Sequence, residues 1–255
     1  MADTVLRYTE TGFLVILPGD NPRLIIDAML ETGYSEEFCV SPYFDPGFIA
    51  GLMEAGFLVM SVGASPPAEG GEEGLLQYIL LPKLHLKRSV LFFDRLHIKK
   101  TIKRYLNRYE LRYDSDFDRI LDRCLAIHGE DWLTPPLVAA IRHIRRAGFR
   151  GARPVSFGLY RDGKLAAGEF GVIAGNVYTS YSGYRDESNS GTVQLILTAQ
   201  YLREHGFAFF DLGMPLDYKT LLGAEDLEPG DFVRFFRSGQ DRSEQDAVQK
   251  PQIQL

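Results

Sequence analysis

The stretch from Arg153 to Leu212 constrains the fold of this 255-residue chain more than any other part. It contains three apolar or alternating runs, Val155 to Tyr160, Leu165 to Ile173 and Val177 to Tyr184, separated by short turn sequences that contain glycine. Runs of this length and pattern are typical of strands, and short turns favour antiparallel neighbours. The stretch therefore predicts a three-stranded meander.

A helix and a further strand follow the meander. Thr192 to His205 reads as a buried helix, and Gly206 stands where helices commonly end. Phe207 to Leu212 reads as an apolar strand. The order β-β-β-α-β is the core order of the GNAT acyltransferase fold, an analogy at the level of fold only. We therefore expect an α+β protein with a GNAT acyltransferase-like C-terminal domain.

The sequence also indicates where domains begin and end. Residues 1–92 mix short apolar segments with a break rich in Pro, Gly and Glu from Ala64 to Gly74, which predicts a small mixed N-terminal domain with an exposed loop. Residues 93–240 form the GNAT-like domain, and residues 241–255 form a polar tail. Disorder is expected in the polar stretch from Ser238 onward.

Further local patterns predict individual elements. Gly12 to Pro18 and Phe57 to Val62 read as strands, and Pro46 to Gly56 as a short helix. Tyr78 to Leu81 and Ser89 to Phe93 resemble a pair of strands. The region from residue 97 to residue 147 is expected to be mainly helical.

A strongly basic segment interrupts an otherwise acidic chain. From Lys83 to Arg112 there are ten Lys or Arg residues against two acids, a net charge of +8, while the whole chain carries −6. From Ile98 the apolar residues share one face of a helix and the cations share the other. A local field of this sign attracts phosphates, with RNA as the leading partner. The alternative is a solvated helix face.

Other features exclude some classes of protein. The longest apolar runs fall far short of the roughly 20 residues that a membrane span needs. The N-terminus has no secretory signal pattern, so the expected compartment is the cytoplasm. Cys39 and Cys124 lack metal-type spacing, and the five histidines are scattered. We expect no metal site.

Asp211 is the first candidate for chemistry. It ends an apolar strand just before Gly213, where a chain leaving a sheet presents its last side chain to a crevice. A carboxylate at such a place can orient an attacking amine or accept its proton. It can equally brace the turn into the next segment.

Several blocks of the chain carry a recognisable pattern. Phe210 to Ala224 matches I-D-C-Q-x-x-N-D-H-x-x-S-L-G-A without a gap, and Leu96 to Arg104 is similar to L-H-I-S-R-S-x-K/R-R. Trp132 to Thr134 is similar to W-I-T, Asp162 to Val172 to D-G-x-L-V-G-G-x-Y-G-V, and Arg88 matches the arginine of W-S-P-D-P-R. With these blocks the chain resembles the leucyl/phenylalanyl-tRNA-protein transferase family over roughly residues 41–237.

The resemblance implies an aminoacyltransferase that works without a cofactor. Such an enzyme moves a Leu- or Phe-like amino acid from aminoacyl-tRNA to the N-terminal amine of an acceptor protein, which tags that protein for degradation by the N-end rule. Family acceptors begin with Arg or Lys, and acids such as Glu169, Asp186 and Glu187 would supply the matching negative charge. The alternative for these acids is a solvated acidic rim.

The resemblance also implies roles for individual residues. Asp211 takes the place of the family's catalytic Asp and would orient and deprotonate the amine. The predicted catalytic residues are Asp211, Ser180 and Tyr181. The predicted substrate-binding residues are Trp132, Glu169, Phe170, Ser182, Gly213 and Met60. The predicted tRNA-binding residues are Arg88, His97, Lys99, Lys100, Lys103 and Arg104.

This chain departs from the family at two places that matter for chemistry. The family's G-E-S-M-F-S-R reads Thr179 to Arg185 here, so Ser180 stands in place of its Glu. The Gln that follows the catalytic Asp by two residues is Gly213. Ser180, Tyr181 or a water would have to replace the missing groups.

Two other functions remain open at the level of sequence. One is a catalytically silent relative that binds tRNA with the basic helix. The other is an acyl-coenzyme A N-acetyltransferase, whose pyrophosphate loop needs R-x-x-G-x-G/A before the helix. The segment from Arg185 to Ser188 lacks the glycine that such a loop requires.

Overall fold

The structure is a computed structural model that describes residues 6–64, 77–149 and 151–246. The chain divides into two compact units. The first unit consists of residues 1–86 and 121–153, and the second of residues 87–120 and 154–255. Residues 121–153, which the sequence analysis assigned to the C-terminal domain, therefore cluster with the N-terminal segment. The predicted loop, apart from Ala64, lies outside the described residues.

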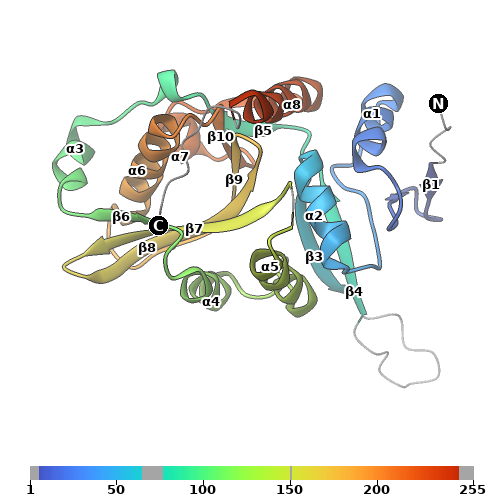
Figure 1. Cartoon of the computed structure of the whole chain (residues 1–255), viewed down its shortest axis with the longest axis horizontal. Coiled ribbons are helices and arrows are strands. Elements are labelled where there is room, and N and C mark those ends of the chain that lie inside the picture. Colours follow the sequence, from blue (N-terminus) through green and yellow to red (C-terminus); the bar gives the residue numbers. More distant parts are fainter. Residues whose placement is uncertain (1–5, 65–76, 150, 247–255) are drawn as a thin grey trace. The chain divides into compact units, whose positions relative to one another are not determined.

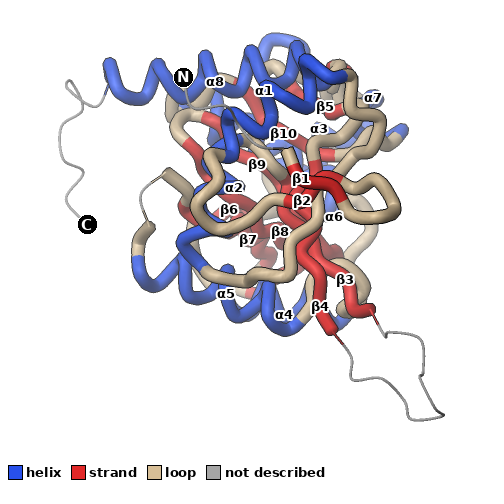
Figure 2. The backbone as a smooth tube through the Cα atoms, turned by 90° about the vertical axis from the view of Figure 1, so that its right-hand side faces the viewer, coloured by secondary structure: helices blue, strands red, loops and turns tan. Residues whose placement is uncertain are grey.

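The first unit combines helices with two small two-stranded sheets, β1–β2 and β3–β4. Figure 2 shows β3 and β4 side by side, and their pairing is antiparallel from Leu58 opposite Lys83 to Ala64 opposite Gln77. The elements of this unit are β1 (Arg7–Tyr8), β2 (Leu14–Val15), α1 (Pro22–Thr32), α2 (Pro46–Ala55), β3 (Leu58–Ala64), β4 (Gln77–Lys83) and α5 (Pro135–Ala147).

Side-chain caps define where α1 and α2 begin. Asn21 accepts a hydrogen bond from the backbone N–H of Arg23, and Asp45 accepts one from the backbone N–H of Phe48. A proline follows each cap, where its missing N–H costs nothing. Helix α1 was not among the elements expected from the sequence, although it carries the same start signals as α2.

The second unit is built around a seven-stranded sheet with the order β11-β5-β10-β9-β8-β7-β6. Strands β9 and β10 run parallel, which requires the crossover that helix α6 provides. The elements of this unit are β5 (Arg88–Leu91), η1 (Phe93–Arg95), α3 (Lys100–Leu106), β6 (Glu110–Tyr113), β7 (Arg153–Arg161), β8 (Lys164–Ala174), β9 (Val177–Arg185), α6 (Ser190–Glu204), β10 (Phe209–Gly213), α7 (Asp217–Leu221), β11 (Glu225–Leu227) and α8 (Pro229–Asp246). Helix α4 (Phe117–His128) begins in this unit and ends in the first.

Helix α6 lies across the sheet, and α3 packs beside it (Figure 1). Between α6 and the sheet is an apolar core rich in aromatic rings. Its fully enclosed members include Phe157 and Tyr178, whose rings meet edge to face with centroids 5.1 Å apart. This core makes the middle of the sheet a rigid support for polar side chains on its strands.

The predicted meander, helix and final strand are confirmed as β7, β8, β9, α6 and β10. The predicted pairing of the segments around Tyr78 and Ser89 is wrong, because they form β4 and β5, which belong to different sheets.

The expected disorder from Ser238 onward is wrong as far as Asp246, because this stretch is helical and belongs to α8. Residues 247–255 lie outside the described residues. Strand β6 interrupts the region expected to be mainly helical. The α+β class is confirmed.

Candidate active site and basic surface

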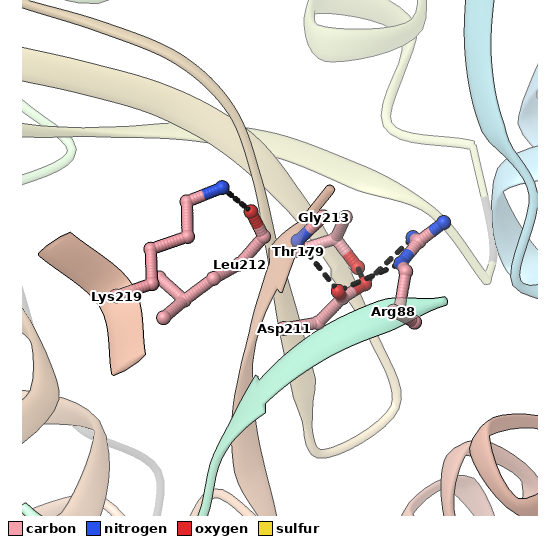
Figure 3. Close-up of polar contacts among 6 residues, drawn as sticks. All are labelled: Arg88, Thr179, Asp211, Leu212, Gly213 and Lys219. Atoms are coloured by element: carbon pink, nitrogen blue, oxygen red, sulfur yellow. Dashed lines mark hydrogen bonds and ion pairs between the residues drawn. The ribbon is translucent and has the colours of Figure 1, made fainter. Parts of the chain in front are cut away.

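Asp211 lies in β10 with its side chain fully buried. Arg88 of the neighbouring strand β5 binds it twice, from Nε to Oδ1 at 2.8 Å and from Nη2 to Oδ2 at 2.7 Å. Thr179, its register partner on β9, donates to Oδ2 at 2.8 Å, and the backbone N–H of Gly213 donates to Oδ1 at 3.0 Å (Figure 3). The carboxylate thus joins three adjacent strands, β5, β10 and β9.

Together these four hydrogen bonds occupy the acceptor positions of the two oxygens of the Asp211 carboxylate. The bidentate pair with Arg88 is charge-assisted, which makes it the strongest kind of side-chain hydrogen bonding in proteins. Asp211 therefore anchors the sheet in this structure. A direct role as the base that deprotonates an amine would require one of these donors to leave first.

Arg88 does not lie with the other predicted tRNA-binding residues. It is 1% exposed, and its guanidinium also stacks on the ring of Phe232 at 4.6 Å from the ring centroid. A side chain enclosed in this way cannot reach a phosphate on the surface of the protein. The predicted contact of Arg88 with tRNA is therefore corrected to a contact with Asp211.

Lys219 of α7 is a buried cation that the sequence did not indicate. Its Nζ donates to the carbonyl oxygens of Leu212 at 2.6 Å (Figure 3) and of Met214 at 2.7 Å. Burial lowers the pKa of this amine to about 8. Lys219 holds the chain as it leaves β10, where Gly213 has a φ of 74°, a conformation that favours glycine. Lys219 matches a variable position of the pattern that covers Phe210 to Ala224, so the sequence did not indicate that it would be buried.

Glu169 of β8 is a second buried carboxyl group, only 1% exposed. The hydroxyl of Ser180 on β9 donates to Oε2 at 2.7 Å, whereas no partner for Oε1 is found in the described part of the chain. Burial raises the pKa of this carboxyl to about 7, although Ser180, Gln194, Thr198 and the charge of Lys219 favour its ionised form. The sequence analysis predicted Glu169 as a substrate-binding residue, and in the structure its side chain on β8 is buried.

A β-bulge brings Ser180 to Glu169. Between the register pairs Phe170–Ser182 and Gly171–Ser180 there is one extra residue on β9, which is Tyr181. In a regular ladder Ser180 would pair one position further along β8 and would face the other side of the sheet. The bulge places Ser180 opposite Gly171, on the same face as Glu169.

The other predicted site residues fall into two groups. In the second unit, Tyr181 and Ser182 are half-buried, and Phe170 is fully buried with its ring 6.1 Å from that of Tyr181. In the first unit, the half-buried Met60 precedes Ser61, whose backbone N–H donates to the carbonyl of Trp132 at 2.9 Å. Met60 and Trp132 are therefore close to each other, and the remaining residues gather on β8, β9 and β10.

Basic side chains on and beside α3 form an exposed surface, which we call the basic surface. It lies beside an open hollow of about 720 Å³ that is lined by residues 96–101 and Lys103. The apolar side of α3 packs through Ile102, Tyr105 and Leu106 on a core cluster that includes Val193 of α6. The members of the basic surface are His97, Lys99, Lys100, Lys103, Arg104 and Arg108, all exposed.

The basic surface is joined to the segment that follows Asp211. The backbone N–H of His97 donates to the carbonyl of Leu222 at 2.9 Å, just after α7. At Gly223 a Cβ atom would lie 2.0 Å from the carbonyl oxygen of Arg95, so only glycine fits at this contact. This places the two family-like blocks, Leu96 to Arg104 and Phe210 to Ala224, against one another.

The loop from Arg185 to Asn189 borders a smaller hollow of about 410 Å³. Glu187 in this loop already has partners, because Arg161 forms an ion pair with it at 2.8 Å and the hydroxyl of Tyr109 donates to it at 2.8 Å. Its charge is therefore partly neutralised inside the protein. Of the acids expected to bind a basic acceptor, Glu169 and Glu187 are both engaged by neighbouring side chains.

Two further properties come from the described residues as a whole. In the described ranges, no helix is long and apolar enough to cross a membrane. Within the same ranges, no three or more His, Cys, Asp or Glu residues gather in a way that would hold a metal ion.

Fold and site together define an α+β protein that carries a cationic surface on the same unit as two buried carboxyl groups. The family model described as leucyl/phenylalanyl-tRNA protein transferase matches residues 90–237, which is more than half of the chain. The chain belongs to this family.

Individual relatives agree with this assignment. A leucyl/phenylalanyl-tRNA–protein transferase from Desulfatibacillum aliphaticivorans is 32% identical over 107 residues, which cover 40% of this chain and 44% of the relative. One from Pectobacterium carotovorum is 26% identical over 168 residues, which cover 65% of this chain and 70% of the relative. The chain thus spans less than half the length of the first of these relatives.

Solved structures are more distant. The structure of L-PGS from Bacillus licheniformis shares 12% sequence identity and a TM-score of 0.36, covering 83% of this chain and 69% of that chain. A protein of unknown function from Bacteroides thetaiotaomicron shares 13% identity and a TM-score of 0.37, covering 84% and 74% of the respective chains. At TM-scores this low, the family assignment rests on the sequence matches alone.

Proposed function

We propose that this protein transfers a Leu- or Phe-like amino acid from aminoacyl-tRNA to the N-terminal amine of an acceptor protein. The observation that carries the proposal is the contact between the basic surface and the segment after Asp211, made by the hydrogen bond from His97 to Leu222. A tRNA held by its phosphates on the basic surface would bring its aminoacylated end toward the polar residues of β8, β9 and β10.

The arrangement of the second unit supports a GNAT-like acyltransferase fold. The strands β7, β8 and β9 are consecutive in the sheet, α6 crosses over, and β10 returns parallel to β9. Asp211 and Thr179 lie on the two parallel strands, at the pair around which the polar residues gather. Polar groups at such a point are suited to bind a substrate.

The proposed reaction needs little chemical activation, because an aminoacyl ester is already reactive. The protein has to align a neutral amine with the ester carbonyl and to stabilise the oxyanion that forms. The C–N bond forms as the C–O bond to the ribose breaks, and a proton of the amine ends on the ribose oxygen. Asp211 contributes by fixing the strands, and Ser180 and Tyr181 are half-buried polar side chains of β9 that would contact the amine.

The location and outcome of the reaction follow from the same assignment. A protein tagged in this way would be degraded by the N-end rule, and the reaction would take place in the cytoplasm, where charged tRNAs are present.

The acyl-coenzyme A alternative is disfavoured, since the loop before α6 has Asn189 at its N-cap and no glycine before Gly191.

The test is to incubate the pure protein with tRNAs charged with different amino acids and with peptides that begin with Arg, Lys, Asp or Glu. Transfer of Leu or Phe to one class of peptide is the expected result, measured by the mass of the peptide. Tight tRNA binding without transfer in any combination would contradict the proposal.

A specific observation favours the second candidate, a silent relative that binds tRNA. The Asp211 carboxylate has all of its acceptor positions filled, and Gly213 has no side chain to approach a substrate. A protein that kept the basic surface and lost its chemistry would show this arrangement. The transfer assay above separates the two candidates.

A further inference from the structure

The pairing of Glu169 with Ser180 is the arrangement in the second unit that the proposed reaction does not yet use. Glu169 is 1% exposed, yet its Oε1 has no hydrogen-bond partner among the residues that the structure describes, which is unusual for a buried carboxyl oxygen. Its other oxygen accepts the hydroxyl of the half-buried Ser180 at 2.7 Å. The carboxyl is thus closed to solvent and reachable through one hydroxyl group.

Ser180 stands at the position where the family pattern has a Glu. The family pattern has Glu at this place, and here the carboxyl stands on the neighbouring strand β8 instead. The bulge at Tyr181 turns Ser180 to the face of Glu169, so that the hydroxyl lies between the carboxyl and the partly exposed side of β9. In this chain the hydroxyl of Ser180 hydrogen bonds to the carboxyl of Glu169, and the serine stands where the family pattern has the Glu.

We propose that Ser180 contacts the substrate amine and passes its proton to Glu169, which makes Glu169 a positioning residue that acts through the serine. The inference rests on the proposed aminoacyl transfer. It assigns to this chain a relay of two residues in place of the single Glu in the family pattern.

The proton steps of the relay balance. As the amine nitrogen attacks the ester carbon, its proton moves to Oγ of Ser180, and the hydroxyl proton of Ser180 moves to Oε2 of Glu169. The C–O bond then breaks, and the ribose oxygen takes the proton back along the same path. Ser180 ends as a hydroxyl and Glu169 as a carboxylate, so the relay is ready for another cycle.

The surroundings of Glu169 suit a group that exchanges protons near neutral pH. Burial raises its pKa to about 7, close to the ordinary α-amine value of about 7.7–8.0. Gln194 and Thr198 of α6 hydrogen bond to each other at 2.9 Å beside it and, with Ser180, favour the ionised form. The titratable groups that face it are Lys219 and Tyr218 of α7.

The experiment measures single-turnover transfer from charged tRNA to a peptide between pH 5.5 and 9. The variants are Glu169→Gln, Ser180→Ala and the double variant Glu169→Gln with Ser180→Glu, which returns the carboxyl to β9. Glu204→Gln, an exposed acid on α6, is the matched control. tRNA affinity and thermal unfolding of each variant are measured beside the rate.

We expect an inflection near pH 7 in the unsubstituted protein and in the control, and its loss in Glu169→Gln. The rate at pH 7.5 should fall on the order of 100-fold in Glu169→Gln and in Ser180→Ala, with tRNA affinity unchanged. The double variant should recover most of the rate, which a merely structural role for Glu169 would not produce.

Two results would overturn the inference, and they are distinguishable. Transfer by Glu169→Gln at the unsubstituted rate with the same pH profile removes the relay and leaves the proposed function standing. An absence of transfer by the unsubstituted protein with every tRNA and peptide removes the proposed function and the relay together.

Discussion

Asp211 and Glu169 are both buried carboxyl groups of the same sheet, and they differ in how their oxygens are satisfied. Asp211 accepts four hydrogen bonds, two of them from the Arg88 guanidinium. Glu169 accepts a short hydrogen bond from Ser180, with Gln194 and Thr198 beside it, and among the described residues no cation forms an ion pair with it. Burial alone therefore does not decide what a carboxyl group does. The number and charge of its donors separate an anchor of the sheet from a group able to exchange a proton.

The largest effect expected from this comparison concerns the anchor. Asp211→Ala leaves the Arg88 guanidinium buried without its partner, and the free energy of unfolding should fall by about 3–5 kcal/mol. Chemical denaturation measures this change. The double variant Arg88→Met with Asp211→Leu removes both charges and should be less destabilised than Asp211→Ala. Equal losses in the two variants would contradict a coupled ion pair.

The second prediction concerns the pH dependence of stability at Glu169. Its pKa in the folded protein is about 7, above the value of about 4.3 for an exposed Glu, so between these values the folded state binds more protons. Stability should therefore fall as the pH rises from 4 to 7. Glu169→Gln removes this cost and should be more stable than the unsubstituted protein at pH 8, by about 4 kcal/mol at most.

The measurement is denaturant unfolding of both proteins at pH 4 and pH 8. The difference between them should be small at the lower pH and largest at the higher one. A difference that does not change with pH would mean that the pKa of Glu169 is not raised in the folded protein.

A third prediction asks whether RNA binding is independent of both carboxyl groups. Reversing Lys99, Lys103 and Arg104 to Glu should weaken tRNA binding by roughly 100-fold and reduce its dependence on salt. Filter binding over a range of salt concentrations measures both quantities. Glu169→Gln should bind tRNA normally in the same assay. Unchanged affinity after the charge reversal would make the basic surface an ordinary solvated face.

The smallest expected effect on the free energy of unfolding concerns Asp45, an exposed carboxylate that caps a helix. Asp45 caps α2 by accepting a hydrogen bond from Phe48 at 2.8 Å. Asp45→Ala should lower the free energy of unfolding by about 1 kcal/mol, and Asp45→Asn by less, since Asn also caps helices well. Thermal unfolding of the two variants provides the comparison. A loss as large as that of Asp211→Ala would remove the distinction between buried and exposed carboxylates.

Much of the second unit follows from local sequence patterns, because β7, β8, β9, α6 and β10 each have a clear period and lie between turn or end signals. The pairing of β5 with β10 and β11 does not follow, since it joins segments more than 100 residues apart. The candidate site shows the same limit. Asp211 stands at a recognisable strand end, but its partner Arg88 is 123 residues away in the chain.

Buried ionisable groups were the hardest to foresee. The burial of Lys219 and Glu169 had no signal in the sequence, because Lys and Glu are almost never fully buried without a partner. Their burial depends on carbonyl groups and hydroxyl groups that only the folded backbone brings together. The extra residue of the bulge has no signature in the sequence either.

The bulge at Tyr181 divides β9 into two segments of opposite phase. Residues 177–180 alternate between the faces of the sheet in one sense, and residues 182–185 alternate in the other. Position-by-position alignment of this strand with a relative that lacks the bulge would assign one half of its side chains to the wrong face. Deleting Tyr181 should leave Phe170 opposite Ser182 and Gly171 opposite Ser180 in a regular ladder, so Ser180 should still face Glu169 while the two segments of β9 alternate in a single phase.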